Sequence, residues 1–277
     1  MRNTAKLTTA VLAAGALTLG LTACGSDKDS AGSSDYSGPL VVAASPAPHA
    51  EILNFVKKNL AEKAGLDLEV KEFTDYITPN TATEDGSVDA NYFQNQPYLD
   101  DFNKTRGTHI APVVTVHLEP LGLYSHKVEK ADALKSGATI AVPNDAVNEA
   151  RALKLLAAGG LITLKDGAGS GATPRDIAKN PKNLQFKEVE AAQTARSLDD
   201  VDAAVINGNF ALPVGIKPAK DALILESAKN SRYGNFLAVK EGNEKDPRVK
   251  KLAKLLTSPE VKKFIEDKYQ GSVLPTF

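Results

Sequence analysis

The chain has no tryptophan and only one cysteine, Cys24, in 277 residues. A lone cysteine has no partner for a disulfide bond. If Cys24 serves a purpose other than catalysis, the chain has no cysteine left to form a Cys–His nucleophile. There is no Gly-x-Ser-x-Gly nucleophile elbow, and His49, His109 and His126 are scattered without the spacing of metal ligands. These absences weigh against an enzyme of the common nucleophilic or metal-dependent kinds. We expect neither a cofactor nor a metal.

An excess of positive charge is also missing. Beyond residue 23 the chain carries 31 basic and 34 acidic side chains, a formal charge of −3, which argues against nucleic acid as a partner. The glycine-rich stretch 167–171 lacks the lysine that would follow in a phosphate-binding loop, so we interpret it as a flexible loop. With 42% hydrophobic and 24% charged residues, the composition is that of a globular protein long enough for two lobes.

The first 24 residues resemble a bacterial lipoprotein signal. Arg2 and Lys6 precede an apolar run over 7–21, which is too short for a comfortable transmembrane helix, and Cys24 follows directly. We predict a signal peptide over 1–23, lipidation of Cys24, and a flexible tether over 24–38 that is small and polar. A structural or catalytic thiol is the alternative role for Cys24. The prediction places the protein at the cell membrane, lipid-anchored on the extracytoplasmic face.

From residue 39 onward, short apolar runs typical of strands alternate with amphipathic stretches typical of helices. Predicted strands over 40–44, 66–73 and 88–93 alternate with helical stretches over 46–65 and 97–106. Such alternation predicts an α/β protein with a mainly parallel sheet covered by helices. Ligands of such sheets bind beyond the carboxyl ends of the strands, so the residues directly after each strand are candidates for a site.

Two interruptions of this pattern predict two lobes. The apolar stretch 110–124 is broken by Pro120 and Gly122, and a later run at 236–239 would return the chain to its first lobe, where two helices close it. We therefore assign 39–122 and 231–277 to lobe 1 and 123–230 to lobe 2. Two lobes joined by two crossings enclose a cleft, which is the layout of a solute-binding protein.

The segment 138–160 reads as a buried strand, a polar turn and a helix. Asn144 or Asp145 is a suitable N-cap, and Asn148 and Arg151 project from one face near the helix N-terminus, where a negative charge is favoured. A guanidinium matches a carboxylate with two parallel hydrogen bonds. The stretch alone leaves open whether Arg151 binds an anion or is an ordinary solvated helix residue.

Seven blocks along the chain resemble the NlpA/MetQ family of methionine-binding lipoproteins, the substrate-capturing components of ABC importers. The blocks are PAPHAEIL (46–53), FTDYITPN (73–80), DANYFQNQPYL (89–99), VHLEPLGLYS (116–125), AVPNDAVNEARAL (141–153), LDDVDAAVINGNFA (198–211) and SVLP (272–275). The resemblance implies a two-lobed periplasmic-binding-protein-like fold of type II, with each lobe a sheet flanked by helices. It also implies capture of methionine, L or possibly D, by a monomer that delivers it to an ABC permease.

The same resemblance assigns roles to polar residues. It implies that Arg151 pairs with the ligand carboxylate, with Asn148 beside it, and that Asn207 and Asn235 make further polar contacts to the amino-acid backbone. From the residues alone, Asn207 and Asn235 could equally be turn formers next to Gly208 and Gly234.

The resemblance further implies an aromatic pocket for the ligand side chain, made by Tyr76, Phe93 and Tyr98, with His117 approaching the cleft. An unbranched thioether suits such a pocket because sulfur makes favourable contacts with ring edges. Packing between lobes is the alternative role for the rings, and a structural role is the alternative for His117. Where many relatives have histidine this chain has Asn95, which places a different set of polar groups in the pocket.

Other functions stay open at this point. The ligand could be another amino acid or a methionine-containing dipeptide. An extracytoplasmic enzyme on the same fold is a second class, although the sequence carries none of the motifs named above. A surface adhesin is a third class; it would explain the lipid anchor but not a cleft with an arginine and several amides.

Overall fold

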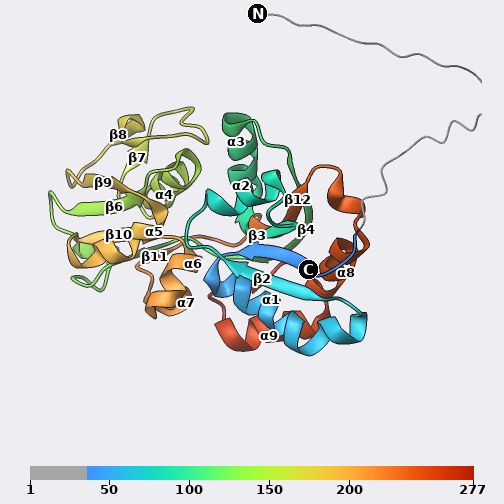
Figure 1. Ribbon diagram of the computed structural model, residues 1–277. Helices are drawn as coiled ribbons and strands as arrows, with labels where there is room; N and C mark the ends of the chain where they lie inside the picture. Colours follow the sequence, from blue (N-terminus) through green and yellow to red (C-terminus); the bar gives the residue numbers. More distant parts are fainter. Residues whose placement is uncertain (1–35) are drawn as a thin grey trace, which may run out of the picture. The chain divides into compact units, whose positions relative to one another are not determined.

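The computed structural model describes residues 36–277 (Figure 1). The predicted signal peptide, Cys24 and most of the predicted tether lie outside the described residues. Among the helices described, none is both long and apolar enough to span a membrane.

The first sheet contains six strands in the order β13-β4-β12-β3-β1-β2. Strand β1 pairs in parallel with β2 and β3, whereas β12 runs antiparallel between β3 and β4. The strands predicted near 40–44, 66–73 and 88–93 are therefore confirmed. The sheet consists of β1 (Leu40–Ala44), β2 (Leu68–Glu72), β3 (Ala90–Asn95), β4 (Ile110–Leu118), β12 (Gly234–Lys240) and β13 (Leu274–Pro275).

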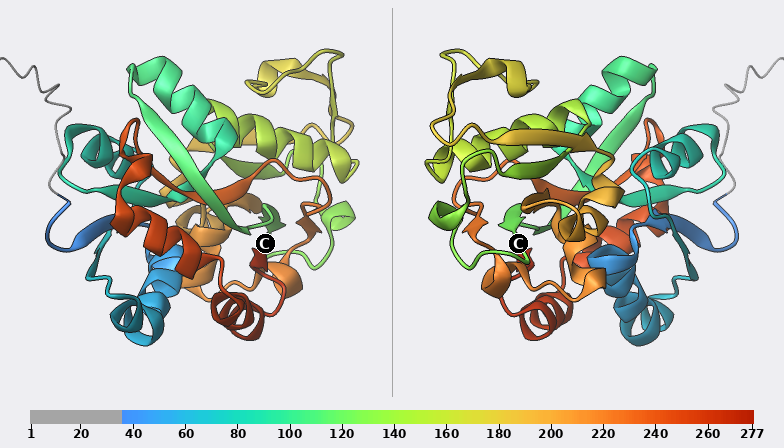
Figure 2. Two further views of the ribbon diagram at one scale, coloured as in Figure 1. Left: turned by 90° about the vertical axis from the view of Figure 1, so that its right-hand side faces the viewer. Right: turned by 90° about the vertical axis from the view of Figure 1, so that its left-hand side faces the viewer.

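Helices cover both faces of this sheet. One face packs on α1 (Glu51–Val56), α8 (Pro247–Leu256) and α9 (Pro259–Tyr269), which Figure 2 shows gathered on the same side. Short π and 3-10 turns flank α1: η1 (Pro46–Ala50), η2 (Lys57–Ala61) and η3 (Glu62–Ala64). The other face carries α2 (Thr78–Asp85) and α3 (Gln96–Arg106). Because side chains alternate along a strand, Val42 joins the first core and Ala43 the second.

The second sheet has five strands in the order β11-β5-β10-β6-β9. They are β5 (Gly122–Tyr124), β6 (Thr139–Pro143), β9 (Gln185–Val189), β10 (Ala203–Ile206) and β11 (Ile224–Leu225). A separate two-stranded sheet pairs β7 (Thr163–Leu164) with β8 (Ile177–Lys179). The helices of this part are α4 (Ala146–Ala158), α5 (Ala191–Thr194), α6 (Gly208–Ala211) and α7 (Pro218–Asp221). Its 3-10 turns are η4 (Ala131–Ala133), η5 (Pro174–Asp176), η6 (Arg196–Asp199) and η7 (Leu212–Val214). One further 3-10 turn, η8 (Asn243–Lys245), precedes α8.

Helix α4 forms where the sequence predicts it, and its start explains the position of the site. Asp145 is the N-cap, because its side chain accepts a hydrogen bond from the backbone N–H of Asn148. Leu153 and Leu156 on its apolar face are fully buried in the core of the second sheet. The helix ends where Gly159 lies so close to Ile224 that an added Cβ would be 2.2 Å from the isoleucine side chain.

The chain passes between the sheets twice, at 119–121 and at 226–233. The two crossovers lie side by side, because the backbone N–H of Glu226 donates to the carbonyl of Leu121 at 2.8 Å. The polypeptide thus builds two αβ lobes of the expected two-lobed class. The boundaries after 122 and after 230 stay a prediction.

Candidate functional site

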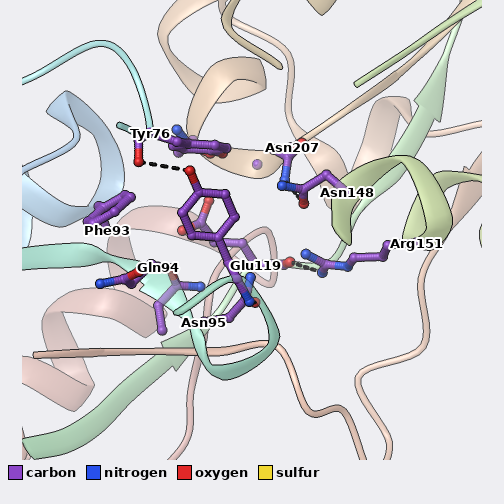
Figure 3. Close-up of a pocket in the computed structure, with 12 residues that line it drawn as sticks. Tyr76, Phe93, Gln94, Asn95, Glu119, Asn148, Arg151 and Asn207 are labelled. Carbon is purple, nitrogen blue, oxygen red and sulfur yellow. Dashed lines mark hydrogen bonds between the residues drawn. The ribbon is translucent and has the colours of Figure 1, made fainter. Parts of the chain in front are cut away.

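A pocket lies between elements of the two sheets (Figure 3). Eight of the nine residues predicted to contact a ligand line it, and His117 does not. The lining residues are Tyr76, Phe93, Gln94, Asn95, Tyr98, Glu119, Asn148, Arg151, Asn207, Gly208, Asn209 and Asn235.

Aromatic rings form one wall of the pocket. The centroid of Tyr76 lies 5.9 Å from that of Phe93 and 5.6 Å from that of Tyr98, and Phe93 and Tyr98 are 6.1 Å apart. A fourth ring, Phe210 of α6, lies 5.0 Å from Tyr76. These are the separations of edge-on and tilted aromatic contacts, so the three predicted rings form one cluster.

Tyr76 also connects the two lobes. Its hydroxyl donates to Oδ1 of Asn209 on α6 at 2.5 Å, and its backbone carbonyl accepts from the Tyr98 hydroxyl at 2.9 Å. Tyr76 belongs to the segment between β2 and α2, whereas α6 follows β10 of the second sheet. The first of these hydrogen bonds therefore crosses the cleft.

Arg151 is buried in α4, with only 5% of its surface exposed, which rules out a solvated helix residue. Its Nε and Nη2 donate to the two carboxylate oxygens of Glu226 at 2.8 and 2.5 Å. Nη2 also donates to the backbone carbonyl of Glu119 at 3.0 Å, and the guanidinium lies 4.0 Å from the ring centroid of Tyr233. Within residues 36–277, Nη1 of Arg151 makes no hydrogen bond to the protein, in contrast to Nε and Nη2.

The pocket amides form a chain of hydrogen bonds from the α4 cap. Nδ2 of Asn148 donates to both oxygens of Asp145 at 3.0 Å, and Oδ1 of Asn148 accepts from Nδ2 of Asn207 at 2.9 Å. Both polar atoms of Asn148 are thus used by the protein. Oδ1 of Asn207 is buried and has no partner in the part of the chain described.

Asn95 is the last residue of β3 and has a structural role that its position in the sequence does not reveal. Its Oδ1 accepts from the backbone N–H of Tyr98 at 3.2 Å and so caps the N-terminus of α3. The amide oxygen therefore accepts a hydrogen bond from the protein itself.

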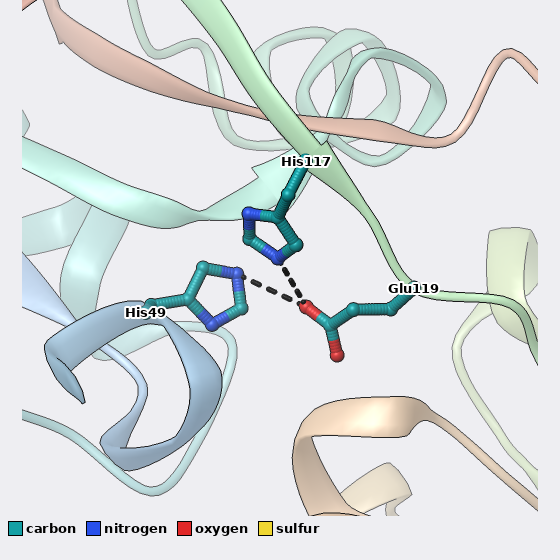
Figure 4. Close-up of side chains that lie close together, drawn as sticks. All are labelled: His49, His117 and Glu119. Carbon is teal, nitrogen blue, oxygen red and sulfur yellow. Dashed lines mark hydrogen bonds and ion pairs between the residues drawn. The ribbon is translucent and has the colours of Figure 1, made fainter. Parts of the chain in front are cut away.

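Behind the pocket lies a buried polar cluster (Figure 4). Oε1 of Glu119 lies 2.8 Å from Nε2 of His117 and 3.3 Å from Nε2 of His49. Nδ1 of His117 is bonded to the Tyr92 hydroxyl, and Nε2 of His49 lies 3.0 Å from Oδ1 of Asn235. His117 therefore lies behind Glu119 instead of at the pocket wall.

The protonation of this cluster follows from its contacts. The Tyr92 hydroxyl donates to Nδ1 of His117, which places the ring proton on Nε2 facing Glu119. Nε2 of His49 faces two oxygen acceptors and must also carry a proton. Burial lowers the pKa of His49 to about 4 and that of His117 to about 3, so both rings are neutral at pH 7. Burial raises the pKa of Glu119, and nearby His49 and Arg151 oppose that rise.

His49, His117 and Glu119 are also of the types that bind zinc, and their donor atoms lie within 4.8 Å of one another. In this arrangement Nε2 of His117 is hydrogen-bonded to Oε1 of Glu119, and Nε2 of His49 is hydrogen-bonded to Oδ1 of Asn235. We assign no metal to it.

Sequence reasoning missed several of these residues. His49 received no role and Glu119 and Glu226 were not singled out, because their partners are distant in sequence. A usable signal existed for two of them: His49 lies in η1, the first turn after β1, and Glu119 lies in the 116–125 block between strands of different sheets. Gln94 lies within β3 and Asn209 lies in α6 after β10, but nothing local distinguished them from their neighbours.

Two αβ lobes, two crossovers and a pocket between them with aromatic rings at one side and buried polar groups at the other define a two-lobed solute-binding protein. The chain belongs to the NlpA lipoprotein family, whose family model matches residues 40–277.

Individual relatives are similar over most of their length. The methionine-binding lipoprotein MetQ of Bacillus subtilis is 42% identical over 92% of this chain and 93% of that protein. A nutrient binding protein from Burkholderia cenocepacia, solved bound to methionine, is 47% identical with a TM-score of 0.83, covering 86% of this chain and all of that one. A periplasmic substrate-binding protein of an ABC transporter from Coxiella burnetii is 43% identical with a TM-score of 0.82, covering 86% of this chain and 100% of that one.

Proposed function

We propose that this protein captures methionine in the pocket between its lobes and delivers it to the permease of an ABC importer. The observation that carries the proposal is the division of the pocket into an aromatic wall, with Tyr76, Phe93 and Tyr98, and a polar wall, with Arg151 and the amides. An apolar thioether suits the first wall, and the charged ends of an amino acid suit the second.

The relatives support the same ligand. The Bacillus subtilis protein is named for methionine binding, and the Burkholderia cenocepacia protein was solved with methionine. The relation to an ABC transporter component supports a permease as the partner. We further propose that the protein acts as a monomer without chemistry of its own, tethered to the extracytoplasmic face by a lipid on Cys24.

Thermal denaturation with added ligands tests the proposal. A ligand that binds only the folded state raises the melting temperature with concentration. We expect methionine to raise it strongly, norleucine less, and alanine or glutamate hardly at all. Loss of the longer side chain forfeits roughly 0.8 kcal/mol per methylene-sized group, and a glutamate carboxylate would be buried unpaired among the rings.

Mass spectrometry of gently purified protein separates the alternatives. A retained amino acid supports capture, and turnover of that amino acid would instead indicate an enzyme. If glycyl-methionine gives a larger thermal shift than methionine, the natural ligand is a dipeptide. A pocket that neither retains nor binds any of these compounds would leave an adhesin as the better explanation.

A further inference from the structure

Helix α8 carries positive charge along the side that faces away from the core. Val249 and Leu252 are fully buried in the core of the first lobe, whereas Lys250, Lys251 and Lys254 are exposed. Successive residues of an α-helix are turned by roughly 100°, so these three lysines fall within an arc of about 100°. They form one stripe, which we call the lysine stripe.

The charge of the lysine stripe is not offset by carboxylates. No aspartate or glutamate occurs within α8, and among the ion pairs of residues 36–277 none involves the stripe. The neighbouring turn η2 packs beside α8 and adds exposed Lys57 and Lys58, again without an acid. Acidic side chains return in η3 and after it, at Glu62 and Asp67. This excess of positive charge contrasts with the formal charge of −3 beyond residue 23.

The first described residues of the chain are held at the same helix (Figure 1). Arg248, in the first turn of α8, donates from Nη1 to the carbonyl of Pro39 at 2.9 Å, and its guanidinium lies 5.8 Å from the ring centroid of Tyr36. The charge of Arg248 is already paired, at 2.7 Å with Asp246 and at 3.0 Å with Asp89. Arg248 therefore fixes the start of the folded body beside the lysine stripe.

The length of the preceding chain limits how far α8 can be from the lipid proposed at Cys24. From position 24 to position 36 there are twelve residue steps, which span at most roughly 40 Å when fully extended. Helix α8 itself has ten residues and is about 15 Å long. Attraction between exposed charges extends only about 8 Å at physiological salt, but a body held on so short a chain can turn its lysine stripe to the membrane surface.

Building on the lipid anchor of the proposed function, we propose that the α8 face of lobe 1 docks on the anionic phospholipid head groups of the membrane through Lys250, Lys251 and Lys254. Each lysine near an anionic surface favours the contact about fivefold, so the three together favour it roughly 100-fold. The contact does not involve the ligand pocket, because no lining residue of the pocket belongs to α8. It is reversible and weakens with salt, so the body can leave the lipid surface.

A fluorescent label on the lipidated, full-length protein tests which face meets the bilayer. Once a lipid occupies Cys24, an introduced cysteine is the only reactive thiol in the chain. Pro247→Cys places the label on the exposed side of α8, and Lys104→Cys places it on α3, which covers the opposite face of the first sheet. Energy transfer to acceptor lipids in vesicles reports how close each label is to the bilayer.

We expect transfer from position 247 to rise at least about twofold when phosphatidylglycerol replaces about a third of the phosphatidylcholine. The rise should vanish in about 0.5 M NaCl, because salt screens the attraction. Transfer from position 104 should not rise. If transfer from position 247 is the same on both kinds of vesicle, the inference is wrong.

Substitution of the lysine stripe tests whether the contact depends on these residues. The combined change Lys250→Gln, Lys251→Gln and Lys254→Gln should lower the ratio of docked to undocked protein roughly 100-fold, with methionine affinity unchanged. The matched control removes the same charge from exposed positions of the second lobe, through Lys135→Gln, Lys154→Gln and Lys187→Gln together. It should leave the ratio within about twofold of the unaltered protein, because these positions lie outside α8.

Two further results would overturn the inference. An equal loss of docking in both triple variants would mean that net charge, and not the α8 face, draws the protein to the lipid. A stripe variant that still docks on vesicles but lowers methionine uptake by cells would indicate that the face binds the permease. Both results leave methionine capture and the anchor intact, whereas mass spectrometry showing no lipid on Cys24 would overturn the anchor, and the inference with it.

Discussion

Arg151 shows how the surroundings of one side chain decide its energetic role. Its position on α4 follows from local sequence, but Glu226, Tyr233 and the Glu119 carbonyl, which hold its guanidinium, come from both crossovers. The guanidinium therefore joins the second lobe to the two segments that lead into the first. Its removal should affect stability as well as ligand binding.

We predict that Arg151→Ala weakens methionine binding by tens to thousands of fold and also lowers the free energy of unfolding. Loss of one member of a buried charge pair costs on the order of 2–5 kcal/mol, and here it leaves Glu226 unpaired. Arg151→Lys should not restore either property, because an ammonium cannot form two parallel bonds. Calorimetry and urea unfolding measure both, with Lys154→Ala as the control on the exposed face of α4. If Arg151→Ala binds methionine with nearly the wild-type affinity, Arg151 does not contact the ligand.

Gly208 offers a second test at the same scale. A methyl group at this position would be 2.7 Å from Oε2 and 3.0 Å from Cβ of Glu119, so either the carboxylate or α6 must shift. We expect Gly208→Ala to weaken methionine binding at least tenfold by displacing Glu119, whose side chain lines the pocket. The matched control is Gly171→Ala, because an added Cβ at Gly171 would have no atom within 4 Å. Gly242→Ala would not serve, because Gly242 has a positive φ that alanine rarely adopts. An unchanged affinity in Gly208→Ala would contradict the close packing of α6 on Glu119.

Helix α3 depends on a residue that also faces the pocket. Asn95 caps it through a hydrogen bond to the Tyr98 backbone, and Tyr98 in the first turn supplies one of the pocket rings. The cap thus determines both the start of the helix and the position of a ring that we expect to contact the ligand.

We predict that Asn95→Ala lowers the free energy of unfolding by about 0.5–2 kcal/mol, the usual cost of losing an N-cap, and also weakens methionine binding. Asn95→Ser should recover most of the stability because serine is a good cap. The matched control is Ser258→Ala, which removes the cap of α9 far from the pocket lining. It should lose similar stability without a change in affinity. Equal effects of the two alanine variants on binding would show that Asn95 has no particular influence on the pocket.

At the scale of the whole molecule, two buried neutral histidines make stability depend on pH. The pKa of His49 falls from 6.5 to about 4 in the folded protein and that of His117 to about 3, because burial disfavours their charged forms. Between pH 6.5 and those values the unfolded chain binds more protons than the folded one. Stability is therefore complete above pH 6.5 and declines as the pH falls, by on the order of 3 kcal/mol per histidine near pH 4.

The variant His117→Gln tests this origin of the pH dependence. We expect a shallower decline in unfolding free energy between pH 7 and pH 4.5, measured with urea, because one titrating group is gone. Glu119 remains in both proteins, so the difference between their slopes isolates His117. The exposed His126, replaced by glutamine, should leave the slope as it is. A His117→Gln protein with an unaltered slope would mean that His117 is not buried in its neutral form.

Attachment to the membrane is also a property of the whole protein, and it depends on the predicted role of Cys24. A lone cysteine after an apolar run and before a polar segment predicts a lipid anchor. Two hydrophobic anchoring groups hold a protein at a membrane far better than one does. We expect Cys24→Ser to release the protein from the membrane fraction or to leave an unprocessed precursor. The control is Ser26→Ala in the adjacent tether. A cleaved Cys24→Ser protein that still fractionates with membranes would refute the role of Cys24.

Sequence by itself determined the features that depend on neighbouring residues. The periods of two and 3.6 residues located β1, β3, β6, α4, α8 and α9. The sequence narrowed the cap of α4 to Asn144 or Asp145, and the structure shows that Asp145 is the cap. The alternation of these elements was enough to predict two αβ lobes with a cleft. Most residues of the pocket wall were also identified, because the blocks that contain them resemble the NlpA/MetQ family.

Only the tertiary structure decided how those residues pair. Glu226 lies 75 positions from Arg151, and His49 lies 70 positions from Glu119, so no local pattern relates them. The partner of a buried charged group shifts the pKa of that group and determines which of its atoms can still bind a ligand. Here the packing of the two crossovers against each other determines which residues become partners. For this reason the sequence pointed to Arg151 as the partner of a ligand carboxylate, whereas only the fold shows that Glu226 already pairs with its guanidinium.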